Sequence, residues 1–239
     1  MDNGHYKWKN QSKANGDLMK LKAVLFDLDG TLIDSMGIWR DVDFEYLNKR
    51  GIEVTPELFK DMPEGNSFNE LAIYVKNKFG LPDKIEEICN EWTQMVKKHY
   101  EDKIELRKGV LELLNFLNEK NVVMGIGTSN SLELTTAVLK NNNVFQYFQE
   151  IICGDRKLRG KPYPDIFIQA ADALKIPNEQ CLVIEDTLVG VQSAKKANMK
   201  IIAIKESNSL DDWHEISNLA DHTVEEFNEI QVYLEKMLR

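Results

Sequence analysis

The chain has 239 residues, of which 43% are hydrophobic, and this size and composition suit a globular protein with a sizeable buried core. Its formal net charge of −9 argues against nucleic-acid and anionic-membrane partners, since both are negatively charged themselves. The three cysteines form no C-x-x-C pair, and the chain has neither a bilayer-length apolar stretch nor a secretory signal. We therefore expect a soluble, cytoplasmic protein with reduced cysteines. Nothing in the sequence predicts an oligomeric state.

Residues 1–19 are polar and show no helical or strand periodicity, which predicts a flexible leader. After the leader, short continuous apolar runs predict strands that are buried on both faces, at 21–26, 121–127, 150–153, 181–185 and 200–204. From residue 104 onward these runs alternate with segments of helical periodicity, at 110–119, 131–141, 164–175 and 188–198. This alternation predicts an α/β fold, with a Rossmann-like parallel sheet and helices on both of its faces.

Residues 35–103 break this alternation and read as an all-helical block. A helix is expected from about 36 to 50. Two further stripes of side chains at helical spacing are Phe68, Leu71, Ala72, Val75 and Phe79, and then Ile85, Ile88, Cys89, Trp92, Met95, Val96, His99 and Tyr100. Most aromatic side chains of this block are expected to pack inside the helical bundle. We therefore predict an all-α cap domain at 35–103, inserted into a core formed by 20–34 and 104–239.

Polar clusters follow three of the predicted strands. They read DLDGT at 27–31, TSN at 128–130 and ED at 185–186, and a fourth cluster, GKPYPD, occupies 160–165 before a predicted helix. In an open parallel sheet, ligands bind beyond the carboxyl ends of the strands, and these ends share one edge. The sequence therefore predicts one functional site at this edge.

In this order and spacing, the four clusters resemble the motifs of the haloacid dehalogenase-like superfamily. The narrower resemblance is to the branch with a helical cap between the first two motifs, which contains phosphoglycolate phosphatase-like enzymes and β-phosphoglucomutase. It covers residues 22 to about 225 of this chain. The resemblance implies a Mg²⁺-dependent phosphatase that hydrolyses a small phosphorylated metabolite.

Asp27 is the candidate nucleophile. A carboxylate can attack phosphorus to form an aspartyl phosphate, which divides one difficult hydrolysis into two easier steps. Both reactants are anionic, so a divalent cation is expected between them, and carboxylate oxygens suit Mg²⁺. The expected metal ligands are Asp27 and Asp186, with the backbone carbonyl of Asp29 as a third ligand by resemblance to the family. Glu185 is expected beside these ligands rather than on the metal.

The remaining candidates handle protons and the phosphoryl group. Asp29, two residues from the nucleophile, is expected to protonate the leaving alkoxide and then to take a proton from the attacking water. Thr128, Ser129 and Lys161 are expected to bind the phosphoryl oxygens, with the ammonium group neutralising charge in the transition state. Thr31 is expected to hold the turn and Asp29.

Each cluster alone has a purely structural explanation. The aspartates of DLDGT could shape a turn, and an isolated Lys161 is more often a solvated surface lysine. Glu185 and Asp186 could complement the dipole of the following helix. Asn130, with Glu133 three residues later, is expected to cap the helix that follows. Four coincidences at one sheet edge are less probable than one site, so we favour the site.

Two other functions stay open: a β-phosphoglucomutase-like hexose phosphate mutase and a non-catalytic binding module. Asp29 argues for phosphate ester chemistry, because the dehalogenases lack the second aspartate and a binding module has no chemical need for it. Trp39 stands where the mutase has a cap histidine, and the cap-loop segment 64–70 lacks the basic residue of the mutase. Both differences weaken the mutase assignment. The identity of the metabolite is not predicted by the sequence.

Overall fold

The computed structural model describes residues 21–55, 68–102, 104–155, 158–206 and 209–238. The predicted flexible leader at 1–19 and most of the cap-loop segment 64–70 lie outside the described residues. No helix within the described ranges is long and apolar enough to cross a bilayer.

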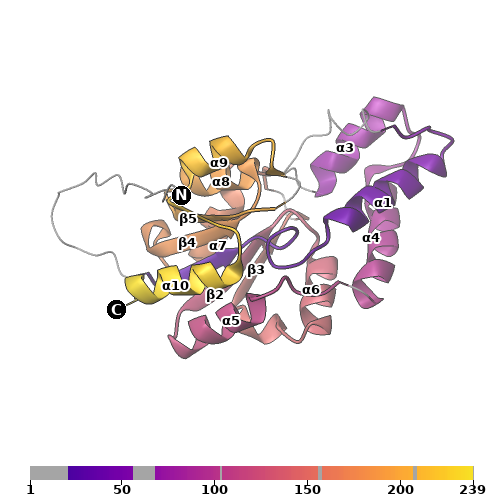
Figure 1. Cartoon of the computed structure of the whole chain (residues 1–239). Helices are drawn as coiled ribbons and strands as arrows, with labels where there is room; N and C mark the ends of the chain where they lie inside the picture. Colours follow the sequence, from indigo (N-terminus) through magenta and orange to yellow (C-terminus); the bar gives the residue numbers. More distant parts are fainter. Residues whose placement is uncertain (1–20, 56–67, 103, 156–157, 207–208, 239) are drawn as a thin grey trace, which may run out of the picture.

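In the described part of the chain, six strands form one parallel sheet in the order β3-β2-β1-β4-β5-β6 (Figure 1). They are β1 (Ala23–Phe26), β2 (Val123–Thr128), β3 (Glu150–Cys153), β4 (Cys181–Glu185), β5 (Lys200–Ile204) and β6 (His222–Val224). β1 pairs with β2 on one side and with β4 on the other, so the first strand of the chain lies in the middle of the sheet. The predicted parallel sheet is confirmed.

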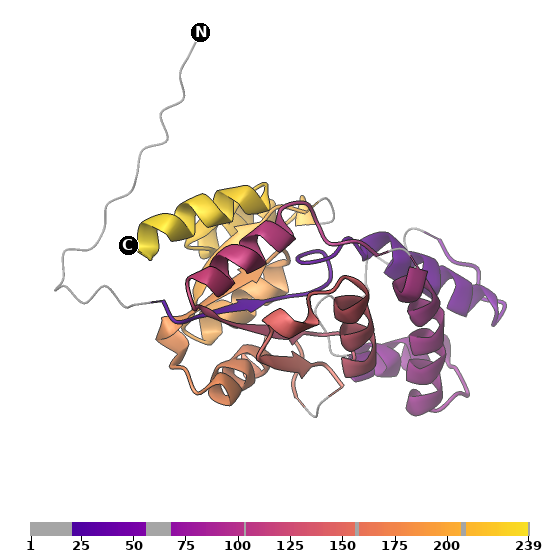
Figure 2. The same cartoon turned by 90° about the horizontal axis from the view of Figure 1, so that it is seen from below.

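Helices cover both faces of this sheet. They are α5 (Val110–Glu119), α6 (Leu132–Asn141), α7 (Asp165–Leu174), α8 (Leu188–Lys196), α9 (Trp213–Leu219) and α10 (Phe227–Met237), with 3₁₀ turns η1 (Phe145–Tyr147) and η2 (Asn178–Gln180). Alternate residues of β1 face opposite sides: Val24 and Phe26 share a core with α5, α6 and α10, whereas Ala23 and Leu25 share one with α7, α8 and α9. Figures 1 and 2 show α5 beside α10 on one side of the sheet.

A second group of helices lies beside the core: α1 (Met36–Asn48), α3 (Phe68–Phe79) and α4 (Ile85–Asp102) (Figure 1). Tyr46 and Trp92 are buried at the centre of this group, where their rings meet edge to face with centroids 5.4 Å apart. These two aromatic side chains therefore pack inside the bundle, as expected. The inserted helical cap is confirmed, while its boundaries at 35 and 103 stay a prediction.

The cap and the core make direct contacts. The two chain crossings between them lie side by side, because Ile33 and Leu106 form an antiparallel bridge. α4 packs on α6, where Lys97 Nζ and Glu133 Oε1 are 2.8 Å apart. Since α6 follows the carboxyl end of β2, these contacts bring the last turns of α4 close to the edge of the sheet where the predicted site lies.

The sequence analysis did not predict β6, α9 and α10. β6 pairs with β5 at the sheet edge and has three residues, which is too few to show a pattern. α10 buries Phe227, Ile230 and Leu234 on one face, and their spacing of three and four residues is a helical signal that the sequence does carry.

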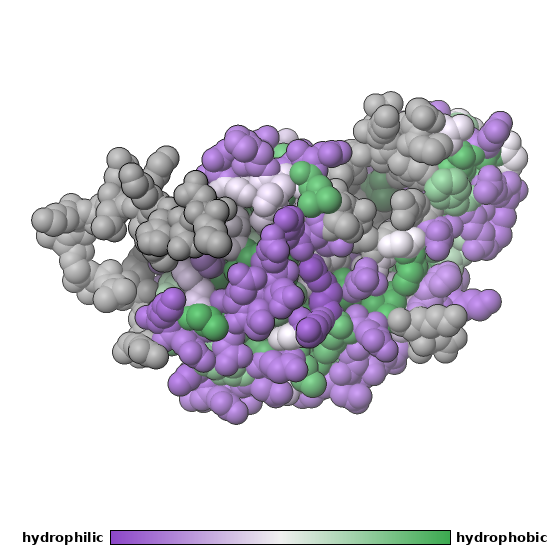
Figure 3. Space-filling model, in the orientation of Figure 1, coloured by the Kyte–Doolittle hydropathy of each residue, from purple (hydrophilic) through white to green (hydrophobic). Residues whose placement is uncertain are grey.

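The surface in Figure 3 is mainly hydrophilic over the core, in keeping with the high content of charged residues. Large apolar side chains exposed in the described ranges include Ile73, Leu111, Leu132, Tyr163, Leu210 and Val232. They belong to different elements, and scattered exposed apolar side chains of this kind are ordinary in folded proteins.

Asp43 on α1 gives a test of stability against pH. Burial raises the pKa of this half-buried carboxyl group to about 7, and no hydrogen bond or ion pair to it is present within the described ranges. The folded state therefore binds a proton that the unfolded chain releases near pH 4, so the native state loses stability as the pH rises from about 4 to 7.

We expect Asp43→Asn to raise the free energy of unfolding at pH 8 by roughly 1–3 kcal/mol, and to leave it unchanged near pH 4. Urea unfolding at both pH values measures this difference. Asp41→Asn, at an exposed position of the same helix, is the matched control and is expected to change little. Equal stability of the Asp43→Asn variant and the wild type at pH 8 would contradict the assignment.

Candidate active site

The register of the central strands brings the polar clusters to one edge of the sheet. Phe26 of β1 is level with Ile126 of β2 and with Ile184 of β4. Asp27 therefore follows β1 at the height of Glu185, the last residue of β4. The Asp27 N–H donates to the Ile184 carbonyl (3.0 Å), which continues the pairing of the two strands up to this residue.

The turn after β1 requires glycine at position 30. Gly30 has a φ of +81°, and a Cβ atom added there would lie 2.4 Å from Asp186 Oδ2. The sequence analysis expects the next residue, Thr31, to hold Asp29, but the Thr31 hydroxyl instead donates to Asp186 Oδ1 (2.6 Å). The turn therefore fixes the carboxylate that follows β4, because it points this hydroxyl toward the neighbouring strand.

Lys161 lies within a buried cluster of charges. Its Nζ donates to Asp27 Oδ1 and to Glu185 Oε1, each at a distance of 2.5 Å. The Lys161 side chain is 4% exposed, and that of Glu185 is 0% exposed. The alternative of a solvated surface lysine is therefore wrong for this residue.

This cluster carries more negative than positive charge, because Asp27, Glu185 and Asp186 are all buried beside one lysine. Burial raises the pKa of Asp27 to about 7; Lys161 acts in the opposite direction, and the charge of Glu185 raises it further. Burial and the charges of Glu185 and Asp27 also raise the pKa of Asp186 well above its ordinary value. The cluster therefore contains three carboxyl groups and only one ammonium group from these four residues.

The two oxygens of Glu185 make different contacts. Oε2 accepts from the N–H groups of Asp186 (2.7 Å) and Thr187 (2.8 Å), at the start of α8, whereas Oε1 binds Lys161. A Cβ atom at Gly190 would lie 1.7 Å from Oε1, so glycine is required where α8 passes this carboxylate. The purely structural explanation, in which Glu185 complements the start of α8, therefore accounts for Oε2 but not for Oε1.

The donor set suits a hard divalent cation. Asp27 Oδ2 and Asp186 Oδ2 accept no hydrogen bond from the described residues, and carboxylate oxygens of this kind are the ligands that Mg²⁺ prefers. Within those residues no three His, Cys, Asp or Glu side chains gather around one metal position.

Asp29 is surrounded by hydrogen-bond donors. Its Oδ1 accepts from Ser35 Oγ (2.5 Å) and from two cap side chains, Trp39 Nε1 (3.0 Å) and Tyr100 Oη (2.6 Å). Its Oδ2 accepts from Asn130 Nδ2 (2.9 Å). Burial raises the pKa of Tyr100 well above its ordinary value, and the charge of Asp29 adds to this, so the phenol is a hydrogen-bond donor at neutral pH. The cap therefore contacts this carboxylate directly.

The loop after β2 holds the next candidates. The hydroxyl of the buried Thr128 accepts from the Asn130 N–H (3.1 Å), and Ser129 is half-buried beside it. Ser131 caps α6, since its hydroxyl accepts from the Leu134 N–H (3.3 Å). The predicted helix cap at Asn130 is therefore wrong by one residue, because the amide of Asn130 is turned toward Asp29 instead.

The structure thus groups most of the predicted residues in two sets. Asp27, Lys161 and Glu185 form one hydrogen-bonded cluster, with Asp186 joined to it through the turn after β1. Asp29 stands beside it with its own set of donors. No hydrogen bond within the described ranges joins the Thr128 side chain to Asp27 or Lys161, so its role in binding phosphate stays a prediction.

The sequence analysis missed three residues beside Asp29: Ser35, Tyr100 and Asn130. Tyr100 lies 71 positions away in the chain, and its place at the end of an apolar stripe indicates bundle core rather than a site. Asn130 was assigned to helix capping. The motif at 128–130 could have indicated Asn130, because it follows β2 at the correct edge, but nothing in the sequence indicates Tyr100.

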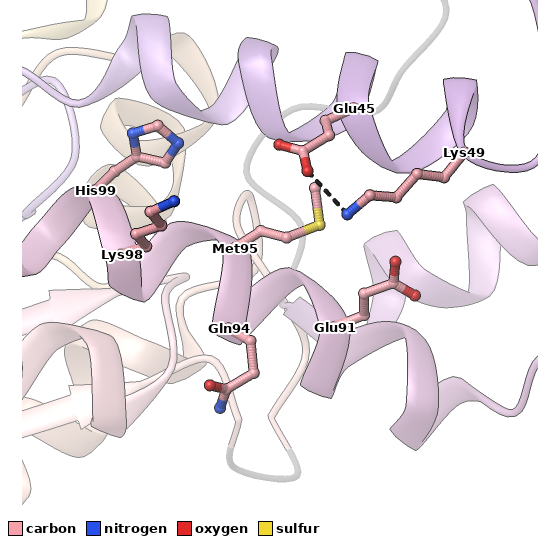
Figure 4. Close-up of a pocket in the computed structure, with 7 residues that line it drawn as sticks. All are labelled: Glu45, Lys49, Glu91, Gln94, Met95, Lys98 and His99. Atoms are coloured by element: carbon pink, nitrogen blue, oxygen red, sulfur yellow. Dashed lines mark ion pairs between the residues drawn. The ribbon is translucent and has the colours of Figure 1, made fainter.

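A separate cavity lies on the cap (Figure 4). Its volume is about 520 Å³, and its lining residues come from α1 and α4: Glu45, Lys49, Glu91, Gln94, Met95, Lys98 and His99. Glu45 and Lys49 form an exposed ion pair along the α1 side of this cavity (2.8 Å). None of the predicted site residues lines this cavity, so it is distinct from the cluster around Asp27.

Known proteins share this sequence pattern. The sequence profile of the haloacid dehalogenase-like hydrolases matches residues 24–204. A bifunctional riboflavin kinase/FMN phosphatase from Arabidopsis thaliana is 33% identical over 193 residues, which are 80% of this chain and 50% of the relative. The protein SUPPRESSOR OF QUENCHING 1 from the same plant is also 33% identical, over 80% of this chain and 18% of the relative. The chain therefore spans half or less of these two relatives.

Other matches extend over most of both proteins. A phosphorylated carbohydrates phosphatase from Thermotoga maritima is 25% identical over 76% of this chain and 84% of the relative. The crystal structure of CbbY from Rhodobacter sphaeroides in complex with phosphate is 25% identical, with a TM-score of 0.78, over 88% of this chain and 96% of that chain. The sequence profile, the shared architecture and the four motifs agree, and the chain belongs to the family of haloacid dehalogenase-like hydrolases.

Proposed function

We propose that the chain is a Mg²⁺-dependent phosphatase that hydrolyses a small phosphorylated metabolite through an aspartyl phosphate on Asp27. The observation that carries this proposal is the buried cluster in which Lys161 binds both Asp27 and Glu185. Such a cluster is expensive to bury and contributes little to stability, so a chemical role explains it better than a structural one.

The first half-reaction uses Asp27 as the nucleophile. A carboxylate oxygen of Asp27 forms a bond to phosphorus while the bond from phosphorus to the leaving oxygen breaks. Asp29 donates a proton to that oxygen, so the metabolite leaves as a neutral alcohol. Ser35, at the predicted start of the cap, and Asn130 of the core hold the Asp29 carboxyl group in place.

The second half-reaction restores the enzyme. Asp29, now ionised, takes a proton from a water molecule whose oxygen attacks the aspartyl phosphate. The bond between phosphorus and the Asp27 oxygen breaks, inorganic phosphate leaves, and both aspartates regain their starting states. Lys161, Thr128 and Ser129 bind the phosphoryl oxygens during both steps, with Lys161 turning from its carboxylate partners toward the anion.

Asp27, Asp186 and the carbonyl of Asp29 would hold Mg²⁺. When bound, the ion neutralises the charge between the nucleophile and the phosphate dianion. The excess of buried carboxylates over ammonium groups supports this assignment, since Asp27, Glu185 and Asp186 share one lysine. The same ion would remove the electrostatic penalty that raises the pKa of Asp27 and Asp186 in the protein alone.

The names of two relatives support the substrate class. One is named a phosphatase of FMN and the other a phosphatase of phosphorylated carbohydrates. We propose a small phosphorylated metabolite for this chain on that basis, without selecting one compound. We also propose a reducing, cytoplasmic location, in keeping with three cysteines that form no C-x-x-C pair.

The experiment that tests the proposal is a screen of phosphorylated metabolites for release of inorganic phosphate. We expect release from at least one sugar or nucleotide phosphate with Mg²⁺, and its loss when EDTA removes the metal and return when Mg²⁺ is restored. Release that persists unchanged in EDTA would contradict the metal requirement.

A second arm of this experiment separates hydrolysis from phosphoryl transfer between sugars. Trp39 donates to Asp29, but an indole cannot carry a proton at neutral pH, which does not favour a mutase. With a hexose 1-phosphate, Mg²⁺ and a bisphosphate primer, phosphorus NMR is expected to show inorganic phosphate as the main product. Hexose 6-phosphate that accumulates much faster than inorganic phosphate would contradict the hydrolase assignment.

A further inference from the structure

Tyr100 is held at both of its ends by groups outside the cap. Its hydroxyl donates to Asp29 Oδ1 (2.6 Å) and accepts from Asn130 Nδ2 (3.0 Å). Its backbone carbonyl accepts from Asn141 Nδ2 on α6 (2.9 Å). The Tyr100 side chain is 1% exposed, whereas Asp29 is half-buried. A cap residue is thus built into the surroundings of the proposed acid and base.

The contacts of Asp29 are divided unequally between its oxygens. Ser35, Trp39 and Tyr100 all donate to Oδ1, whereas Asn130 alone donates to Oδ2. A carboxylate has about four lone-pair positions, two on each oxygen. Oδ1 is therefore fully occupied, and Oδ2 keeps one position for a further partner.

From this geometry we infer that Tyr100 is a positioning residue for the phosphatase reaction, which occupies Asp29 Oδ1 so that Oδ2 gives and takes the proton. The inference rests on the proposed role of Asp29 and adds a residue that none of the four motifs contains. Because Tyr100 sits in the last turns of α4, which pack on α6, it aligns Asp29 only while the cap is docked on the core. Proton transfer is thereby restricted to the docked cap.

A purely structural role makes a different prediction. Loss of the hydroxyl would then lower stability and affect all substrates alike. A positioning role affects both proton transfers by Asp29, and in the step that forms the aspartyl phosphate the loss then depends on the leaving group. An alkyl phosphate needs protonation of its leaving oxygen, whereas p-nitrophenyl phosphate releases a stable phenolate without it.

The test is Tyr100→Phe, which keeps the ring and removes one hydroxyl. We expect kcat/KM, which reports only the steps up to formation of the aspartyl phosphate, to fall about 10-fold to 100-fold for an alkyl phosphate and much less for p-nitrophenyl phosphate. Tyr46→Phe is the matched control, because Tyr46 is also a buried cap tyrosine but its hydroxyl has no hydrogen-bond partner among the residues that the structure describes. It should leave both activities unchanged.

Thermal unfolding of both variants shows whether the cap remains intact. If Tyr100→Phe unfolds early, Trp39→Phe removes the other cap donor to Oδ1 and is expected to show the same dependence on the leaving group. Normal kcat/KM on both substrates, or equal losses of kcat/KM on both, would overturn the inference. Asp29→Asn separates it from the proposed function. If Asp29→Asn is inactive and Tyr100→Phe is normal, only the role of Tyr100 is refuted. If Asp29→Asn is active, the acid–base assignment of Asp29 is itself refuted.

Discussion

Replacing Asp27 with asparagine is expected to lower kcat by about 10³-fold or more, because the amide keeps the shape of the side chain but cannot act as the nucleophile. Phosphate release under saturating substrate and Mg²⁺ measures this loss. Asp34→Asn is the matched control, since Asp34 is an exposed aspartate seven positions later in the same connection and is expected to be dispensable.

The fold of the Asp27→Asn variant should be intact. Lys161 keeps its contact with Glu185, and one negative charge leaves a cluster that has too many of them. Circular dichroism and urea unfolding are therefore expected to show stability equal to or above that of the wild type. A variant with normal stability and turnover within about 10-fold of the wild type would contradict covalent catalysis by Asp27.

Lys161→Met is expected to affect both activity and stability. It removes the ammonium group that binds two buried carboxylates, and loss of one partner from such a buried pair costs about 3–5 kcal/mol. It also removes a donor to the transferring phosphoryl group, which typically lowers kcat by about 10²–10³-fold. Urea unfolding gives the first quantity, and steady-state kinetics below the unfolding temperature give the second.

Lys196→Met tests whether these losses come from the site or from the loop that carries Lys161. Lys196 is exposed on α8 and donates to the Pro162 carbonyl of the same loop from outside (2.9 Å). Its replacement is expected to change kcat and stability only slightly. Equal losses for the two lysine variants would show that support of the loop, rather than the charge of Lys161, explains the effect.

The sequence was sufficient for the parts of the site that lie on the strand ends. Continuous apolar runs indicate parallel strands, and parallel strands bring their carboxyl ends to one edge of the sheet. The sequence alone therefore placed Asp27, Glu185 and Asp186 together. Lys161 could be assigned to this site only through its motif. It lies in a loop, so no strand pairing predicts its position relative to the strand ends.

The residues that could not be predicted depend on packing between distant elements. Tyr100 reaches Asp29 because α4 docks on α6, and no periodicity within α4 records that contact. Ser131, and not Asn130, caps α6, and the Asn130 side chain is turned toward Asp29. Capping preferences do not resolve a difference of one residue in the position of a helix start. β6 was missed for a different reason: three residues at a sheet edge are too short to show a pattern.

The most direct test of the account is to trap the phosphoryl group on Asp27. Asp29→Asn should still be phosphorylated by p-nitrophenyl phosphate, whose leaving group needs no proton, but it should hydrolyse the aspartyl phosphate slowly because the base is missing. We expect a burst of p-nitrophenolate equal to the amount of enzyme, and mass spectrometry after acid quench and digestion with pepsin at acid pH should find one phosphoryl group on the peptide that contains Asp27. Continued turnover without a burst, with that peptide unmodified, would contradict the aspartyl phosphate mechanism.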